Sequence, residues 1–220
     1  LSNEERVKEL KKTFETSTKK LFDFMVDISN PIELLSLSET GRIDSVIVKK
    51  PEEAKLIRSW ISTGPVKFKL LYRASVDGFK GENFHKKVDG HAPTLTIIRS
   101  NYGKVFGGFS DLEWNSVNNY KNTTNSWVFS LDHKEKYNQK SGQAHYAVYC
   151  YNTYGPTFGG GHDFYIADNA NSGTACYSNF GYTYECPGKT YGSSQAQSHL
   201  AGAYSFSCEE IEVFYLEYKK

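Results

Sequence analysis

Residues 154–171 read YGPTFGGGHDFYIADNAN and contain three consecutive glycines at positions 159–161. His162 and Asp163 follow directly, and a polar cluster with Asp168 and Asn169 comes after a short apolar run. Consecutive glycines cost backbone entropy, so a chain keeps them where it turns sharply or is closely approached. The stretch is not a phosphate-binding loop, because it lacks the Lys-Ser/Thr ending and the GxGxxG spacing. Two interpretations remain, a tight turn that feeds a strand or a place where a partner comes close.

The composition narrows the classes of protein to consider. The 220 residues carry a net charge of +1, so the chain has no strong overall electrostatic attraction to nucleic acid or acidic lipid. No apolar run reaches the ~18–20 residues that a membrane span needs. The 16 tyrosines and 14 phenylalanines favour strands and a sandwich core.

The cysteines indicate a reducing compartment. None of the four belongs to a Cys-x-x-Cys pair, which argues against a zinc site of that kind: Cys150, Cys176, Cys186 and Cys208. No signal peptide begins the chain, and we expect an intracellular, cytoplasmic protein with free thiols. A redox-active thiol needs a lowered pKa and access to solvent. Cys176 and Cys186 lie in loop-like sequence and are the two candidates for that role.

Residues 4–28 show the pattern of an amphipathic helix. Six apolar residues follow one another at alternating steps of three and four, with Ser17 in one seam position: Val7, Leu10, Phe14, Leu21, Phe24 and Ile28. The stripe is narrow, which favours a coiled coil and a homodimer through residues 4–28 over packing on the chain's own domain. Asn30-Pro31 ends the helix, so we expect a coiled-coil-like segment over 1–30, a linker over 31–43 and a domain over 44–220.

The sequence of the domain predicts strands separated by turns. Apolar or alternating runs predict strands at residues 44–48, 68–72, 95–98, 105–109, 127–131, 146–151, 164–167 and 211–218. A helix is predicted to begin at Pro51, and a short helix to lie within residues 74–90. Residues 132–142 and 188–199 are predicted to be polar loops. The fold class is α+β and mainly β, a two-sheet antiparallel β-sandwich flanked by short helices with an N-terminal helical extension.

Seven segments together resemble a known family. They are LLYRASVDGF (70–79), APTLTIIRS (92–100), YGKVFGGFS (102–110), WVFSL (127–131), YGPTFGGGHDFYIADN (154–169), YSNFGYTYE (177–185) and LAGAYSFSCEEIEVF (200–214). Over roughly residues 44–218 the chain resembles the TLDc domain family, with the motifs in the family's order. Ala92 departs from the residue that the family usually has before Pro93.

The resemblance implies a fold, a biological role and a set of residues. The fold is a two-sheet β-sandwich with a few helices, and the role is protection against oxidative stress. Several TLDc proteins bind the vacuolar proton ATPase (V-ATPase) and regulate its assembly, and no catalytic mechanism is established for the family. Residues that match the family pattern are candidate site residues without assigned roles: Arg73, Asp77, His162, Asp163, Asp168, Asn169, Glu210 and Glu212.

Five glycines complete the candidate binding site. They lie in two glycine-rich segments that would let a partner's backbone or side chain come close: Gly107, Gly108, Gly159, Gly160 and Gly161. The leading hypothesis is therefore a non-catalytic TLDc module that acts by binding protein, with V-ATPase subunits as the expected partner. No cofactor and no metal is expected.

Two other functions stay open as alternatives. A hydrolase would use His162 and Asp163 with Ser178 or Ser205, but neighbouring residues on a strand point to opposite faces, and no Gly-x-Ser-x-Gly elbow is present. A calcium site is not supported either, because residues 168–173 depart from the calcium-loop pattern at Ala170 and lack the glutamate that ends such a loop. A DNA-binding regulator would use lysine pairs such as Lys49-Lys50, although a neutral chain argues against tight non-specific binding to nucleic acid.

Overall fold

The computed structural model describes residues 7, 9–18, 43–61 and 65–218. The chain divides into two compact units, residues 1–42 and 43–220. In the first unit, residue 7 and residues 9–18 are helical. The predicted end of this helix at Asn30-Pro31 and the linker up to residue 42 lie outside the described residues.

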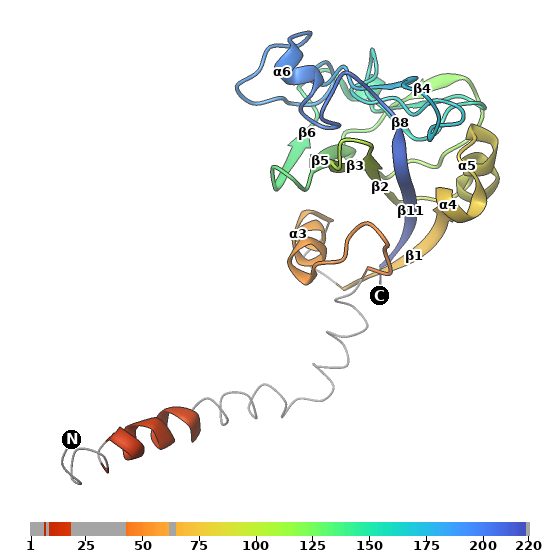
Figure 1. Ribbon diagram of the computed structural model, residues 1–220. Coiled ribbons are helices and arrows are strands. Elements are labelled where there is room, and N and C mark those ends of the chain that lie inside the picture. The colour runs from red at the N-terminus through yellow and green to blue at the C-terminus, as the bar shows by residue number, and fades with distance from the viewer. Residues whose placement is uncertain (1–6, 8, 19–42, 62–64, 219–220) are drawn as a thin grey trace. The chain divides into compact units, whose positions relative to one another are not determined.

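The second unit is built on a six-stranded antiparallel sheet with the order β1-β11-β2-β3-β5-β6 (Figure 1). Its strands are β1 (Val66–Arg73), β2 (Thr94–Ser100), β3 (Val105–Ser110), β5 (Trp127–Ser130), β6 (Glu135–Asn138) and β11 (Cys208–Tyr218). The last strand of the domain, β11, lies between β1 and β2 and pairs antiparallel with both. The two ends of the domain are therefore joined by one set of backbone hydrogen bonds.

Both faces of this sheet are covered. Along β2, Ile97 and Ile98 belong to two different core clusters, and Phe214 and Val213 divide in the same way on β11. Successive side chains of a strand point to opposite faces, so the two clusters occupy opposite sides of the sheet. A sheet buried on both faces needs nearly continuous apolar strands, which explains runs such as LTII in β2.

One face is covered by α3 (Pro51–Ile61) and by the segment that precedes it. The helix begins at Pro51, as predicted, and buries Ala54 and Ile57. The strand predicted at residues 44–48 is wrong, because the structure has no strand there. The hydroxyl of Ser45 instead accepts the backbone N–H groups of Ile47 at 2.9 Å and Val48 at 2.8 Å. This local side-chain bonding replaces the bonds that a strand would make with a neighbour.

The opposite face is covered by a second β layer made of short pieces. One sheet has the order β4-β7-β8, with β4 (Asn119–Lys121), β7 (Val148–Cys150) and β8 (Thr157–Phe158), and the other pairs β9 (Cys176–Tyr177) with β10 (Ser205–Phe206). Isolated bridges from Phe158 to Phe164 and from Tyr165 to Tyr177 connect the two sheets. The two β layers share one apolar core, so the predicted fold class is confirmed.

Short helices and turns differ from the prediction in detail. Residues 74–90 form two helices, α4 (Ala74–Asp77) and α5 (Gly81–Val88), separated at Gly78, whose φ is +102°. The predicted strand at 164–167 is reduced to isolated bridges. The two predicted loops contain β6 and the short helix α6 (Ser194–Gln197), and a 3-10 helix, η1 (Ala144–Tyr146), precedes β7. Within the described part of the chain, no helix is both long and apolar enough to cross a membrane.

Candidate functional site

The three glycines at 159–161 form a turn whose geometry only glycine accommodates. Gly159 and Gly161 have φ of +84° and +67°, the left-handed region that other residues rarely adopt. A Cβ at Gly159 would lie 1.9 Å from Oδ2 of Asp163, and one at Gly160 would lie 2.8 Å from the ring of Tyr182. The close neighbours of the first two glycines are thus side chains of the domain itself.

Asp163 anchors the loop that faces this turn. Its carboxylate is fully buried and accepts four backbone N–H groups, with Gly181 at 2.7 Å and Tyr182 at 3.1 Å among them. The N–H groups of Thr183 and Tyr184 complete the set at 2.9 and 3.3 Å. Burial raises the pKa of Asp163 to about 7, and the four N–H donors oppose this rise. The side chain therefore holds residues 181–184 against the triglycine turn.

His162 has partners of its own. Its φ is +58°, and its Nδ1 lies 3.4 Å from the carbonyl oxygen of Gly159, while burial lowers the pKa of the imidazole. The carboxylate of Asp163 is occupied by the 181–184 backbone and does not orient this ring. Ser178 is buried and donates to the carbonyl of Asp163 at 3.1 Å. The geometry thus provides no serine–histidine–aspartate arrangement at this turn.

The ring of His162 lies within a group of tyrosines on the outer face of the second β layer. It stacks on Tyr165 with 5.7 Å between ring centroids, and Tyr149 lies at 5.3 Å. Ring contacts extend from these residues to form what we call the tyrosine surface: Tyr120, Tyr146, Tyr149, Tyr151, Tyr154, His162, Tyr165, Tyr177, Tyr182, Tyr191 and Tyr204. Tyr182, Tyr191 and Tyr204 are 38, 42 and 44 % exposed, and the others are half-buried.

Strand alternation places these rings outside the core. In β7 the side chains of Val148 and Cys150 are buried, whereas Tyr149 between them is half-buried. Tyr149 is the cross-strand partner of Tyr120 in β4, and their ring centroids lie 4.7 Å apart. Tyr165 and Tyr177 form a second cross-strand pair at 5.0 Å. Cross-strand aromatic pairs stabilise a sheet, so the surface also holds together the short strands beneath it.

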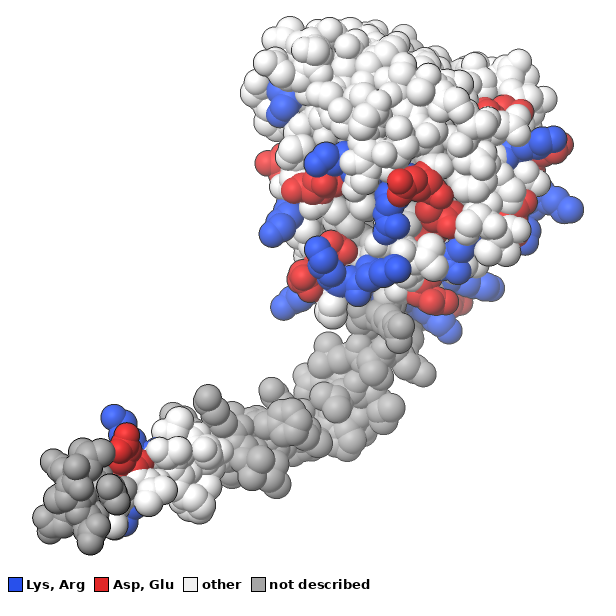
Figure 2. Space-filling view, viewed as in Figure 1, with Lys and Arg blue, Asp and Glu red and all other residues white. Residues whose placement is uncertain are grey.

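The tyrosine surface lies in a part of the domain that is nearly free of charge. Residues 141–208 contain ten of the 16 tyrosines but only four Asp, Glu, Lys or Arg residues: Asp163, Asp168, Glu185 and Lys189. Figure 2 shows the consequence, with charged side chains gathered over the lower part of the domain and an upper part that is almost uniformly uncharged. An uncharged aromatic surface loses little hydration energy when a partner covers it.

Gly107 and Gly108 lie away from solvent in the central strand β3. A Cβ at Gly107 would lie 2.0 Å from the carbonyl oxygen of Thr96, and one at Gly108 would lie 2.6 Å from the ring of Phe158. Gly108 therefore allows the second β layer to approach the sheet closely, whereas Gly107 leaves room for Thr96 and for the ring of Phe129 within the sheet itself.

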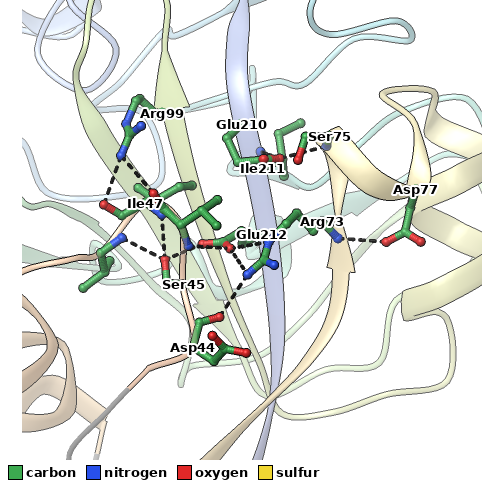
Figure 3. Close-up of polar contacts among 12 residues, drawn as sticks. Asp44, Ser45, Ile47, Arg73, Ser75, Asp77, Arg99, Glu210, Ile211 and Glu212 are labelled. Carbon is green, nitrogen blue, oxygen red and sulfur yellow. Dashed lines mark hydrogen bonds and ion pairs between the residues drawn. The ribbon is translucent and has the colours of Figure 1, made fainter.

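Four charged candidate site residues lie together at the junction of β1, β11 and α4 (Figure 3): Arg73, Asp77, Glu210 and Glu212. Arg73 pairs with the buried Glu212 at 2.7 Å, and Asp77 accepts the backbone N–H of Arg73 at 3.0 Å. Glu210 accepts the N–H groups of Ser75 and Ile211, both at 3.0 Å. Each of these side chains thus fastens one backbone segment of the domain to another.

The last two candidate site residues, Asp168 and Asn169, lie at the N-terminus of helix α5. Oδ1 of Asp168 accepts the N–H of Gly81, the first residue of α5, at 2.9 Å. Asn169 has a φ of +53° and donates through its side-chain amide to Asp168 at 3.0 Å. A carboxylate at a helix N-terminus satisfies an otherwise unpaired N–H and complements the helix dipole.

The two candidates for a redox-active thiol, Cys176 and Cys186, lack the access to solvent that this role needs. All four cysteines are buried and free of disulfides, and Cys176 is only 1 % exposed. A hydrogen bond from Cys208 lowers the pKa of the Cys176 thiol, whereas burial and the nearby Cys176 raise that of Cys208. No group of three His, Cys, Asp or Glu side chains placed to hold a metal occurs among the described residues.

The candidates chosen from sequence missed the tyrosines and two residues of the segment before α3. Ser45 and Val46 both donate to the carboxylate of Glu212, and Arg99 donates to the carbonyl of Ile47 at 3.0 Å. A sequence signal that could have found the tyrosine surface is the near absence of charge over residues 141–208. No sequence motif marks Ser45, because its role depends on a contact with a residue 167 positions away.

The fold and the site define a two-layer β domain with an uncharged aromatic surface on its outer layer. The chain belongs to the TLDc domain family, because the family's model matches residues 43–217. A comparison with curated proteins gives no match. Membership supports an oxidative-stress-related role and a role in protein interaction.

Proposed function

We propose that this chain is a non-catalytic TLDc module that acts in oxidative-stress protection by binding another protein, with subunits of the V-ATPase as partner. The observation that carries this proposal is the tyrosine surface, a connected group of ten tyrosines around His162 in a region nearly free of charge. The family's association with the V-ATPase supplies the identity of the partner.

Tyrosine suits such a surface for physical reasons. Its side chain offers a large rigid area with only two rotatable bonds, so little conformational entropy is lost when a partner orders it. Tyrosine is enriched in the central residues of protein interfaces, whereas lysine, aspartate and glutamate are depleted there. The hydroxyl groups keep the surface compatible with water when the partner is absent.

The turn beneath the surface contributes by being rigid. Gly160 donates its N–H to Oγ1 of Thr183 at 2.7 Å and leaves no room for a Cβ between Tyr146 and Tyr182. Asp163 fixes the facing loop from below through four N–H groups. The rings are therefore held in place before a partner arrives, which reduces the cost of binding.

The test measures binding of purified V-ATPase subunits to the full chain. The variant changes the three most exposed rings to serine, Tyr182→Ser, Tyr191→Ser and Tyr204→Ser. We expect the dissociation constant to rise at least tenfold, since one interface hot spot is worth about 2 kcal/mol. Tyr218→Ser is the matched control, because Tyr218 is 44 % exposed, as Tyr204 is, but lies outside the tyrosine surface.

Two results would contradict the proposal in different ways. If the wild-type chain binds none of the subunits, the V-ATPase is not the partner. Cross-linking in cells under peroxide stress, with the triple variant alongside, would then test docking itself. If proteins captured by the wild-type chain are captured equally by the triple variant, the tyrosine surface is not a docking site.

A further inference from the structure

A second site lies in the charged part of the domain. A cavity of about 490 Å³ is formed where three segments meet: residues 47–53 at the start of α3, the β2–β3 hairpin, and the turn between β5 and β6. Each segment contributes at least one basic side chain to its wall, and the four are Lys49, Lys50, Arg99 and Lys134. Two acidic residues, Glu53 and Asp132, also line it.

Both acidic residues are already neutralised. Asp132 accepts from Nζ of Lys104 at 3.1 Å and from the backbone N–H of Val105 at 2.8 Å. Glu53 pairs with Lys50 at 3.5 Å. Within the described ranges, no carboxylate lies at ion-pair distance from the other three cations, Lys49, Arg99 and Lys134. The cavity thus carries an excess of positive charge that the domain does not balance.

Arg99 is held in place without losing its charge. Its Nη2 donates to the carbonyl oxygens of Ile47 at 3.0 Å and Val46 at 3.5 Å, and Figure 3 shows the side chain reaching this segment. These carbonyls orient the guanidinium but leave its full positive charge. No hydrogen bond from Nε or Nη1 occurs among the residues that the structure describes, so these N–H groups remain for an anion. A fixed guanidinium with free N–H groups matches the oxygens of a phosphate.

Lys134 occupies a position that favours another residue type. It ends the turn between β5 and β6 with a φ of +56°, the left-handed conformation in which glycine or asparagine is preferred. Its N–H bonds to the carbonyl of Leu131 at 3.2 Å, so the turn itself does not use the ammonium group. A lysine at this position costs backbone energy, and Lys134 lines the cavity.

We propose that this cavity binds a small anion bearing several phosphate groups, such as an inositol phosphate, either free or as the headgroup of a lipid. Three unbalanced cations from three segments can contact separate phosphates, and a volume of about 490 Å³ is within the range of small-ligand sites. The buried side chains of Ile47 and Leu131 supply an apolar wall for a carbon ring. A site of this size favours a compact ligand over a nucleic-acid strand, which needs an extended basic surface.

The test uses the full chain and two probes. Binding of inositol hexakisphosphate is measured by calorimetry. Binding to membranes is measured by cosedimentation with phosphatidylcholine vesicles that contain about 5 % phosphatidylinositol bisphosphate. This low content limits non-specific attraction between the protein and the charged vesicle surface. The variant is Lys49→Gln with Lys134→Gly, which removes two cations and leaves the turn with its preferred residue. The control, Lys67→Gln with Lys86→Gln, removes the same charge from exposed lysines elsewhere.

We expect the wild type and the control to bind with similar affinity, and the cavity variant to bind at least tenfold more weakly. Binding to the soluble probe alone identifies a free anion as the ligand, and binding to vesicles as well identifies a headgroup. Absence of wild-type binding to both probes, or equal binding by the cavity variant, would overturn the proposal. Tighter binding to a DNA duplex than to inositol hexakisphosphate would also overturn it.

Discussion

Arg73 on β1 and Glu212 on β11 form an ion pair of 2.7 Å in which the glutamate is completely buried. The same carboxylate accepts the hydroxyl of Ser45 and the backbone N–H of Val46, and Arg73 also donates to the carbonyl of Asp44 at 3.0 Å. The pair therefore joins two neighbouring strands to the segment that leads into α3. One buried charge holds together the parts of the domain that come from its two ends.

Changing Arg73 to methionine should destabilise the domain strongly. The substitution leaves Glu212 buried with only Ser45 and Val46 as partners, and removing one member of a buried pair typically costs about 3–5 kcal/mol. We expect a loss of about 3 kcal/mol in urea denaturation, the low end of that range because two donors remain. Lys67→Met, an exposed change on the same strand, should shift the free energy of unfolding by less than about 0.5 kcal/mol. Equal stability of Arg73→Met and wild type would contradict the buried role of the pair.

Five of the six strands of the large sheet were predictable, because their apolar patterns are local. The segment at 44–48 was not, since its β-branched residues resemble a strand whereas Ser45 satisfies its backbone locally. The strand β6 (EKYN) was also missed, because it buries only Tyr137 and otherwise reads as a polar loop. Errors occurred where the hydrogen bonds of a single polar side chain, Ser45, or the burial of a single ring, Tyr137, determines the conformation.

The pH dependence of the free energy of unfolding should reveal the lowered pKa of His199. Its Nε2 lies 2.7 Å from the hydroxyl of Tyr137, and its ring stacks on His133 with 4.0 Å between centroids. Burial, together with His133 and Lys189, lowers the pKa of His199 to about 4, although Glu135 opposes the shift. An unfolded histidine titrates near pH ~6.5, so between the two values the folded state binds fewer protons than the unfolded state. The free energy of unfolding should therefore fall as pH falls from about 6.5 to about 4.

The variant His199→Gln isolates this effect. Glutamine can still bond to Tyr137 but does not titrate, so the stability difference between wild type and variant should shrink as pH falls through that window. Asp163, whose raised pKa stabilises the fold as pH falls, contributes with the opposite sign but equally in both proteins. The exposed His91→Gln serves as control. A difference that stays constant from pH 7.5 to 4.5 would show that His199 titrates normally.

The site was harder to predict than the fold. The charged residues that match the family pattern lie at junctions of the backbone, as Asp168 does at the start of α5 and Glu210 does at Ser75. A family pattern contains residues that hold the fold together as well as residues that contact a partner, and sequence alone does not separate them. The tyrosine content favours strands and a sandwich core, but composition does not reveal which face of a strand a ring occupies.

The thiols should react slowly in the folded protein. Cys150, Cys176 and Cys208 are at most 2 % exposed, and Cys186 is 9 % exposed. Burial raises the pKa of Cys186 and Cys150, which lowers the fraction of thiolate. We expect a thiol-reactive dye to label the native protein slowly, with Cys186→Ser removing the first phase, and all four cysteines to react rapidly in guanidinium. Rapid labelling of Cys176 in the native state would instead revive a direct redox role for that thiol.

The N-terminal helix should associate with a second copy of itself. Val7, Leu10 and Phe14 lie at seam spacing and are 53, 68 and 71 % exposed. Exposed apolar side chains in one stripe are stabilised when a partner helix covers them. We expect sedimentation of the full chain to give a dimer, and Leu10→Glu with Phe14→Glu to give a monomer, because the change places charges in the seam. Lys11→Glu with Lys12→Glu is the matched control, since it also adds acidic residues to the same turn but outside the seam. A wild-type chain with the mass of a monomer at high concentration, or a seam variant that still dimerises, would exclude self-association through this helix.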